Sequence, residues 1–255
     1  MGRLEIGYLL PTRDQAVRGE HEPGQLVGQA RRAEALGVDS VWAGDSPVTR
    51  PRADALLLLA AVADATDRVV LGTAVLLPAL RHPILLAHQL ATLDRLSDGR
   101  LVAGMGAGFP IPQTEAQFAA LDVGFKRRVS RMEESIDAMR RLWTGGPVSF
   151  KGEHFAFEDV TLAPPPSRPG GPPIWLAGGG VHALRRVARL ADGWLPYPPQ
   201  AKTYEREHQA IQDATTRSAA GARHIVARLA TDDHDAALEE FGASVLPLLR
   251  QGEGS

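Results

Sequence analysis

The chain has 255 residues, 44% of them hydrophobic and 23% charged, a length that suits one α/β barrel or two small domains. It contains no cysteine, which excludes disulfide bonds and thiolate metal sites. Its 28 basic and 30 acidic residues leave a net charge of −2, which offers no overall field to attract nucleic acid.

Short apolar runs alternate with longer segments of helical periodicity, the pattern of strand–helix units around a parallel sheet. In the first half we expect strands at Leu4–Leu10, Asp39–Ala43, Val69–Leu76 and Arg100–Gly106. Helices are expected at Gln25–Leu36, Ala53–Ala65, Ile84–Leu96 and Arg128–Leu142. The longest apolar run, Ala53–Ala63, is too short to span a bilayer, and the start lacks a signal peptide. We therefore expect no membrane partner and a cytoplasmic location.

The regular alternation stops after Trp143. Val148–Lys151 and His154–Phe157 predict a hairpin, and a proline-rich stretch, Ala163–Pro173, follows it. Such a stretch is compatible with a domain linker, but another strand follows at once. We therefore favour a surface crossover, with an insertion at about residues 145–173 in a single domain of residues 1–255.

Three further strand–helix units follow the insertion. Their strands are expected at Ile174–Ala177, Gly193–Tyr197 and His224–Ala230, and their helices at His182–Ala191, Tyr204–Ser218 and Ala236–Phe241. This gives seven strands, whereas a closed (β/α)8 barrel needs eight. Ala243–Leu249 either supplies a short eighth strand or continues the last helix up to Pro247. The sequence thus predicts an α/β fold, a TIM barrel with a short or irregular C-terminal end.

In barrels of this class, functional residues follow the C-terminal ends of the strands. Asp45 follows the second strand, where it is either a group at the barrel mouth or a turn and capping residue. Gly72 in the third strand indicates a bulge or the close approach of another group. Arg81 and His82 begin the next helix, where a solvated pair is the simpler interpretation.

Two glycine-rich segments are candidates for cofactor contacts. Gly104-Met105-Gly106-Ala107-Gly108 is not a G-x-G-x-x-G fingerprint, but its alternation leaves one strand face bare for a flat ring or a neighbouring side chain. Gly178-Gly179-Gly180 precedes a helix and forms either a phosphate cradle or a flexible turn. Trp194 lies in the barrel wall or lumen. Because no nucleophile elbow and no H-E-x-x-H motif occurs, cofactor chemistry fits better than hydrolysis or a metal site.

The string Arg81–Leu101, RHPILLAHQLATLDRLSDGRL, closely resembles the luciferase-like monooxygenase superfamily, particularly its probable F420-dependent oxidoreductases. Further matches in family order are Phe125–Arg128, Glu134, Leu142–Trp143, Phe150–Phe155, Pro172–Trp175, Gly178–Gly180 and Ala191–Trp194. The resemblance extends from about Ile6 to Tyr197.

The resemblance implies a luciferase-like (β/α)8 barrel, usually dimeric, with reduced FMN or the deazaflavin coenzyme F420 at its mouth. It places the tail phosphate near Gly178–Gly180 and a non-prolyl cis peptide, here Ala74–Val75, behind the ring. The expected cofactor contacts are Gly72, Thr73, Ala74, Val75, Gly106, Ala107, Gly108, Gly178, Gly179, Gly180 and Trp194.

Many deazaflavin members have Asp-His after the second strand, whereas this chain has Asp45-Ser46. Asp45 is therefore a candidate for cofactor contact or proton handling, and His82 is a candidate to replace the absent histidine.

The implied function is hydride transfer between F420 and a small organic substrate. One alternative is an FMN-dependent monooxygenase that uses oxygen and takes reduced flavin from a partner reductase. A second is a flavin-binding protein without turnover. The substrate is not identified, because the loop Pro110–Val123 belongs to the part of this fold that differs between members.

Overall fold

The computed structural model describes residues 4–196, 224–227 and 233–247. In this part of the chain, seven parallel strands form one sheet in the order β8-β7-β4-β3-β2-β1-β9. The strands are β1 (Glu5–Leu9), β2 (Ser40–Ala43), β3 (Val70–Thr73), β4 (Leu101–Met105), β7 (Ile174–Ala177), β8 (Gly193–Leu195) and β9 (His224–Ala227). The sheet curls into an open half-barrel, so the predicted α/β barrel class is confirmed.

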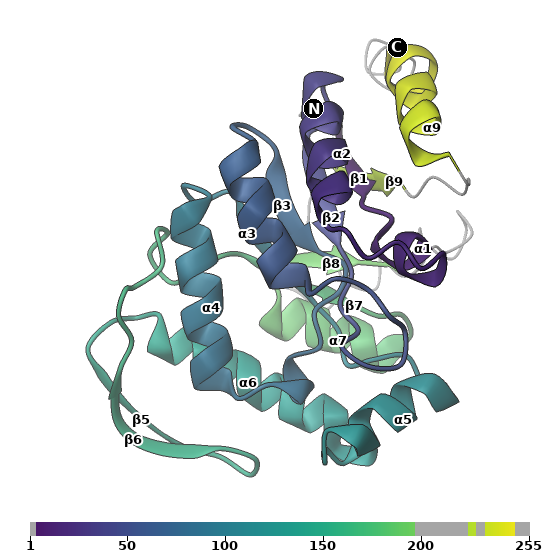
Figure 1. Ribbon diagram of the computed structural model, residues 1–255. Helices are drawn as coiled ribbons and strands as arrows, with labels where there is room; N and C mark the ends of the chain where they lie inside the picture. Colours follow the sequence, from purple (N-terminus) through teal and green to yellow (C-terminus); the bar gives the residue numbers. More distant parts are fainter. Residues whose placement is uncertain (1–3, 197–223, 228–232, 248–255) are drawn as a thin grey trace.

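Helices lie around the sheet (Figure 1). They are α1 (Thr12–Val17), α2 (Gly24–Ala35), α3 (Ala55–Ala65), α4 (Pro83–Leu96), α5 (Pro112–Ala120), α6 (Arg128–Leu142), α7 (Val181–Leu190) and α9 (His234–Glu240). Of these, α2, α3, α4 and α7 contact the strands of the sheet. Asp54 caps α3 by accepting hydrogen bonds from the Leu56 and Leu57 amides. None of the helices within the described ranges is long and apolar enough to cross a membrane.

The C-terminal segment is helical where a strand was one alternative. Phe241–Val245 forms a π-helix directly after α9, and the Leu246 amide bonds to the Phe241 carbonyl. Gly242 packs on Leu36 at the end of α2. The predicted strand at Ala243–Leu249 is therefore wrong as far as Pro247, and the alternative of a continued helix holds to that residue.

The interruption of the half-barrel lies between β8 and β9, not at the C-terminal segment. Because β9 pairs with β1, the break falls between β8 and β9, and no other described strand pairs with these two edges. The predicted helix Tyr204–Ser218 lies outside the described residues, as do Tyr197, residues 228–230 and residues 248–249.

The predicted hairpin is confirmed, with β5 (Pro147–Lys151) antiparallel to β6 (Ala156–Thr161). The hairpin projects from the body beside α4 and α6 (Figure 1). Its second strand begins two residues later than His154, because the Glu153, His154 and Phe155 amides donate to the Glu134 carboxylate at 2.7–3.1 Å. These amides are thus not available for a strand ladder.

Two indole rings fill the interior of the half-barrel. The centroids of the Trp42 and Trp175 rings lie 5.4 Å apart, and the His224 ring packs edge-on against both. A Cβ added at Gly72 would lie 2.1 Å from the Trp42 ring, and one at Gly193 would lie 2.6 Å from the Trp175 ring. The rings fit only because these facing strand positions lack side chains.

This packing predicts opposite effects for two glycine-to-alanine substitutions. We expect Gly72→Ala to lower the free energy of unfolding by about 2 kcal/mol, since the new methyl group displaces fully buried Trp42. Gly28→Ala, in the exposed middle of α2 with open space around it, should raise that free energy by up to about 1 kcal/mol. Urea denaturation measures both, and a Gly72→Ala protein as stable as the unmodified chain would contradict the packing.

Candidate functional site

The strand order brings most of the predicted cofactor residues to one side of the barrel mouth. β3, β4, β7 and β8 are consecutive neighbours in the sheet. Their C-terminal ends lead into Ala74–Val75, Gly106–Ala107 and Gly178–Gly180, and Trp194 lies in β8 itself. Residues from four separate parts of the chain therefore lie along one continuous edge.

A short stretch after β3 leaves the strand ladder and forms a wall at the mouth. The Ala74–Val75 peptide bond is cis, as the sequence resemblance predicts. The Thr73 hydroxyl donates to the Gly104 carbonyl at 2.7 Å, and the Leu76 amide donates to the same oxygen at 2.8 Å. Thr73 and Leu76 are fully buried, whereas Ala74 and Val75 are partly exposed. Ala74 and Val75 are thus accessible to a ligand, and Thr73 holds the backbone behind them.

Glycines in β4 and just after it allow this wall to approach closely. A Cβ at Gly106 would lie 2.7 Å from Val75 Cγ2, and a Cβ at Gly104 would lie 1.9 Å from the Thr73 carbonyl oxygen. Only glycine fits at Gly104 without moving backbone. Gly104 was not among the predicted contacts, although the alternation of glycines includes it.

At two of the predicted cofactor glycines, the side that lacks a Cβ is covered by protein side chains. Trp42 covers the bare face of Gly72, so this glycine allows the close approach of another group, one of its two predicted interpretations. Gly108 has a positive φ of 86°, and a Cβ there would lie 2.9 Å from Thr114 in α5. At both positions the absent Cβ makes room for a protein side chain, and the predicted cofactor contact stays a prediction.

The glycine triplet lies where a strand becomes a helix. Gly178 and Gly180 have φ values of 142° and 78°, which disfavour other residues. Helix α7 begins at Val181, and no side-chain hydrogen bond caps it. Trp194 Nε1 donates to the Gly178 carbonyl at 2.8 Å. The first amides of α7 and the helix dipole thus favour an anion at this position.

Asp45 forms an ion pair within the protein. Its Oδ2 accepts from Arg81 Nη1 at 2.6 Å and from the Leu77 amide at 3.0 Å, and its Oδ1 accepts from Arg81 Nη2 at 3.0 Å. Only 2% of its side chain is exposed. Asp45 therefore ties the end of β2 to the loop after β3. The interpretation of Arg81 as a solvated residue is wrong, because its guanidinium is committed to Asp45.

His82 contacts its own helix and the hairpin. It caps α4 through Nδ1, and its ring packs edge-on against Phe155 of the hairpin at 5.5 Å between centroids. Partial burial, and then the nearby charge of Arg131, lower the pKa of His82 below its ordinary value. The two predicted catalytic candidates thus contact different elements and do not form one group.

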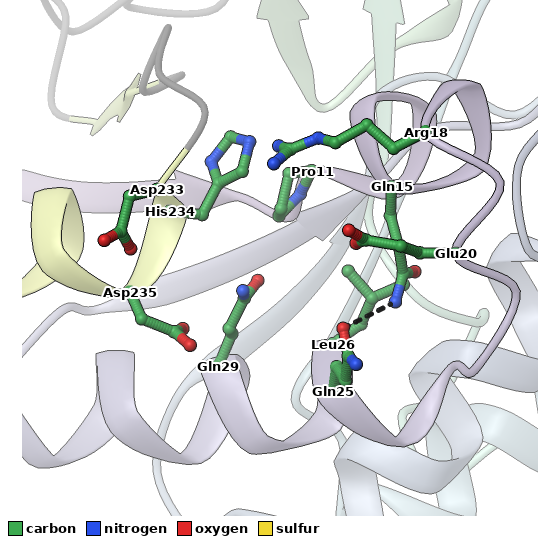
Figure 2. A pocket seen from close by; sticks show the side chains of 10 residues that line it. All are labelled: Pro11, Gln15, Arg18, Glu20, Gln25, Leu26, Gln29, Asp233, His234 and Asp235. Carbon is green, nitrogen blue, oxygen red and sulfur yellow. Dashed lines mark hydrogen bonds between the residues drawn. The ribbon is translucent and has the colours of Figure 1, made fainter.

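A cavity of about 370 Å³ lies between α1, α2 and the start of α9. Figure 2 shows the polar side chains that surround it, including Gln15, Gln29 and His234. None of the predicted cofactor residues lines this cavity, so it is separate from the site at the strand ends.

A chain of polar groups lies beneath the mouth, at the starts of the strands. Trp42 Nε1 donates to Ser40 Oγ at 2.7 Å, Ser40 Oγ is 2.5 Å from His224 Nε2, and His224 Nδ1 is 2.8 Å from Glu5 Oε2. All three bonds are satisfied when neutral His224 accepts from Ser40 and donates to Glu5. Sequence reasoning missed this network because no motif links its members.

The comparison with known families gives one match over nearly the whole chain. The model of the family described as luciferase-like monooxygenase matches residues 4–253. An F420-dependent glucose-6-phosphate dehydrogenase of Amycolatopsis mediterranei is 34% identical over 198 residues, which are 75% of this chain. The match covers 57% of that relative, so the chain spans little more than half of its length.

Solved structures share the fold. The monooxygenase RslO1 from Streptomyces bottropensis superposes with a TM-score of 0.76 at 26% identity, covering 98% of this chain and 80% of that protein. The oxygenating constituent of 3,6-diketocamphane monooxygenase from Pseudomonas putida, in complex with FMN, superposes with a TM-score of 0.76 at 20% identity. That superposition covers 88% of this chain and 67% of the other.

The Asp45–Arg81 pair predicts strong coupling between two substitutions. Removal of one partner of a buried pair leaves the other charge uncompensated, so we expect Asp45→Asn to cost about 3 kcal/mol of stability. Arg81→Met should cost a similar amount, and the double variant clearly less than the sum. Asp137→Asn, in the exposed Arg141–Asp137 pair, is the control and should change stability little. Additive costs in urea denaturation would contradict the structural role of Asp45.

The buried network predicts a pH dependence of stability through His224. Burial lowers the pKa of His224 below its ordinary value of 6.5, more than its bond to Glu5 raises it. The unfolded chain therefore takes up the proton more readily, and stability present above pH 6.5 is lost as the pH falls below it. We expect His224→Gln to be less stable at neutral pH but less sensitive to acid, whereas His82→Gln should keep most of the sensitivity. Equal pH profiles for His224→Gln and the unmodified protein would refute this assignment.

Proposed function

Because the chain belongs to the luciferase-like monooxygenase family, we propose that it is an F420-dependent oxidoreductase acting on a small organic substrate. The observation that carries the proposal is the edge formed by the ends of β3, β4, β7 and β8. This edge combines a partly exposed wall with a glycine cradle at a helix N-terminus. F420-dependent relatives at about one-third identity support the choice of cofactor.

The residues at this edge fit a ring attached to an anionic tail. The amides at the start of α7, next to Gly178–Gly180, would hold the phosphate. Ala74 and Val75 would support the ring, since they are the partly exposed residues of the wall. When bound, the coenzyme supplies or accepts the hydride.

The protein's own contribution is positioning. The Asp45–Arg81 pair fixes the end of β2 against the loop after β3, while Thr73 fixes the wall against β4. We therefore assign Asp45 a positioning role instead of the proton-handling role that its place in the sequence indicates. His82 lies against the hairpin and takes no part in this arrangement.

An FMN-dependent monooxygenase is the second candidate. The FMN-bound 3,6-diketocamphane monooxygenase has the same fold, and a wall beside a phosphate cradle suits either cofactor. In that case a partner reductase would supply reduced flavin. A homodimer and a flavin-binding role without turnover stay predictions from the resemblance.

Cofactor titration tests the proposal. We expect the protein to bind F420 at least tenfold more tightly than FMN, measured by fluorescence. Gly179→Asp should weaken F420 binding at least tenfold, because the new carboxylate repels the phosphate at the start of α7. Gly28→Asp adds the same charge on the exposed face of α2 and should leave binding unchanged.

The outcomes separate the candidates. Tighter binding of FMN would favour the monooxygenase, and failure of both cofactors to bind would overturn the family-based function for this chain. Binding of reduced F420 that no candidate substrate reoxidises would favour the role without turnover. Unchanged affinity of Gly179→Asp would refute the phosphate assignment alone.

A further inference from the structure

A largely buried arginine lies at the end of β2, next to the wall. The side chain of Arg52 lies against Gly44, where an added Cβ would be 1.9 Å from Arg52 Nη1. The same Cβ would be 3.4 Å from the carbonyl oxygen of Ala74. The guanidinium of Arg52 therefore lies beside the first residue of the wall, in the space that a side chain at Gly44 would otherwise fill.

Arg52 has no carboxylate partner in the part of the chain that the structure describes. Its one hydrogen bond there is a long one, from Nε to the Arg50 carbonyl at 3.4 Å. Asp45, the carboxylate closest in sequence, is occupied by Arg81 and the Leu77 amide. Burial lowers the pKa of Arg52 to about 10, so the group is still charged at neutral pH.

Two more arginines act on Arg52, Arg50 from the same loop and Arg13 from helix α1. β1 and β2 pair with Leu9 opposite Trp42, which brings the first turn of α1, with Arg13, close to the loop after β2. Arg13 and Arg50 both repel the charge of Arg52, and neither forms an ion pair with any residue in the described ranges. Asp14 and Asp45 attract Arg52 only through space. We call Arg13, Arg50 and Arg52 the arginine cluster.

The loop that carries this cluster is held in place. Ser46 Oγ donates to Gln117 Oε1 at 2.8 Å, and the Arg50 amide donates to Ser46 Oγ at 3.2 Å. Thr49 Oγ1 donates to the Gln113 carbonyl at 2.5 Å. Because these bonds tie the loop to α5, the positive charges are brought together before any ligand binds.

We propose that the arginine cluster is a binding site for an oxyanion, a carboxylate or a phosphate, of the substrate. Guanidinium groups match the geometry of both anions, and a bound anion would pair with three like charges, none of which has a salt bridge within the described residues. The substrate is then an anionic organic compound. This inference deepens the proposed function and depends on it, because it takes the wall beside Arg52 as the place of reaction.

The site is separate from the glycine cradle. In the sheet order β7-β4-β3-β2, the strands of the wall lie between β7, which leads to Gly178–Gly180, and β2, which leads to Gly44. A coenzyme phosphate at the cradle and a substrate oxyanion at the arginine cluster would therefore lie on opposite sides of the wall. Neither anion would compete for the other's position.

Binding of small anions to the cofactor-free protein tests the proposal. All variants are made in the Gly179→Asp protein, in which the glycine cradle is blocked. Calorimetry then measures how tightly each variant binds inorganic phosphate and acetate. We expect Arg52→Gln to weaken residual phosphate binding at least tenfold, Arg13→Gln to weaken it about threefold, and Arg52→Lys to have an intermediate effect. Arg31→Gln, on the exposed face of α2, is the matched control and should change nothing.

The two probes distinguish the two anion classes. A loss confined to phosphate identifies a phosphate site, and a loss of acetate binding as well shows that the site accepts either oxyanion. Equal phosphate binding with and without Arg52, or no phosphate binding in the Gly179→Asp background, overturns the proposal. If Arg52→Gln does not fold, phosphate binding by Arg13→Gln still tests whether the arginine cluster binds the anion.

A separate titration shows which inference has failed. F420 binding to the otherwise unmodified protein should be the same with Arg52 and with Arg52→Gln. If F420 binding drops tenfold in Arg52→Gln, the arginine cluster holds the coenzyme and the substrate assignment is overturned. If F420 fails to bind even the unmodified protein, the proposed function fails, while the anion measurements still report on the cluster.

Discussion

Close packing of indole rings against glycine is the constraint on which the half-barrel depends. Trp42 and Trp175 fill the space inside the curled sheet because Gly72 and Gly193 leave room for them. His224 joins both rings and links β9 to β1 and β2 through Glu5 and Ser40. The wall and the glycine cradle follow the strands that enclose these rings. The packing of the rings therefore fixes the curvature of the sheet, which brings the strand ends side by side.

Much of the string that resembles the family serves to hold the frame of the site. Besides the Arg81–Asp45 pair, buried Asp94 binds the backbone amide of Arg168 and so anchors the proline-rich crossover. Arg100 donates to the carbonyls of Ala63, Thr66 and Val69 and closes the turn before β3. A match to Arg81–Leu101 therefore indicates that the chain builds the same barrel mouth. It carries little information about the cofactor or the substrate.

The sequence predicted those features that depend on neighbouring residues or on the family resemblance. Strand and helix positions, the hairpin and the strand–glycine–helix turn at Gly178–Gly180 follow from local patterns. At Gly72 the sequence did not reveal Trp42, because a bare strand face looks the same whether a cofactor or a side chain covers it. Likewise, the partners of Asp45 and His82 lie on other elements, and their contacts come from tertiary packing. Arg52 belongs to no motif, and only the folded chain shows that it has no salt bridge within the described residues.

The order of the strands also gives the mouth a length scale. From β7 to β2 there are three strand spacings, about 14 Å along the curved sheet. The two proposed anion sites would be held that far apart by hydrogen-bonded strands, so the distance between them would be fixed. The wall between them would select ligand pairs by their combined reach as well as by their charge. A substrate too short to extend from the arginine cluster to the ring would bind without reacting.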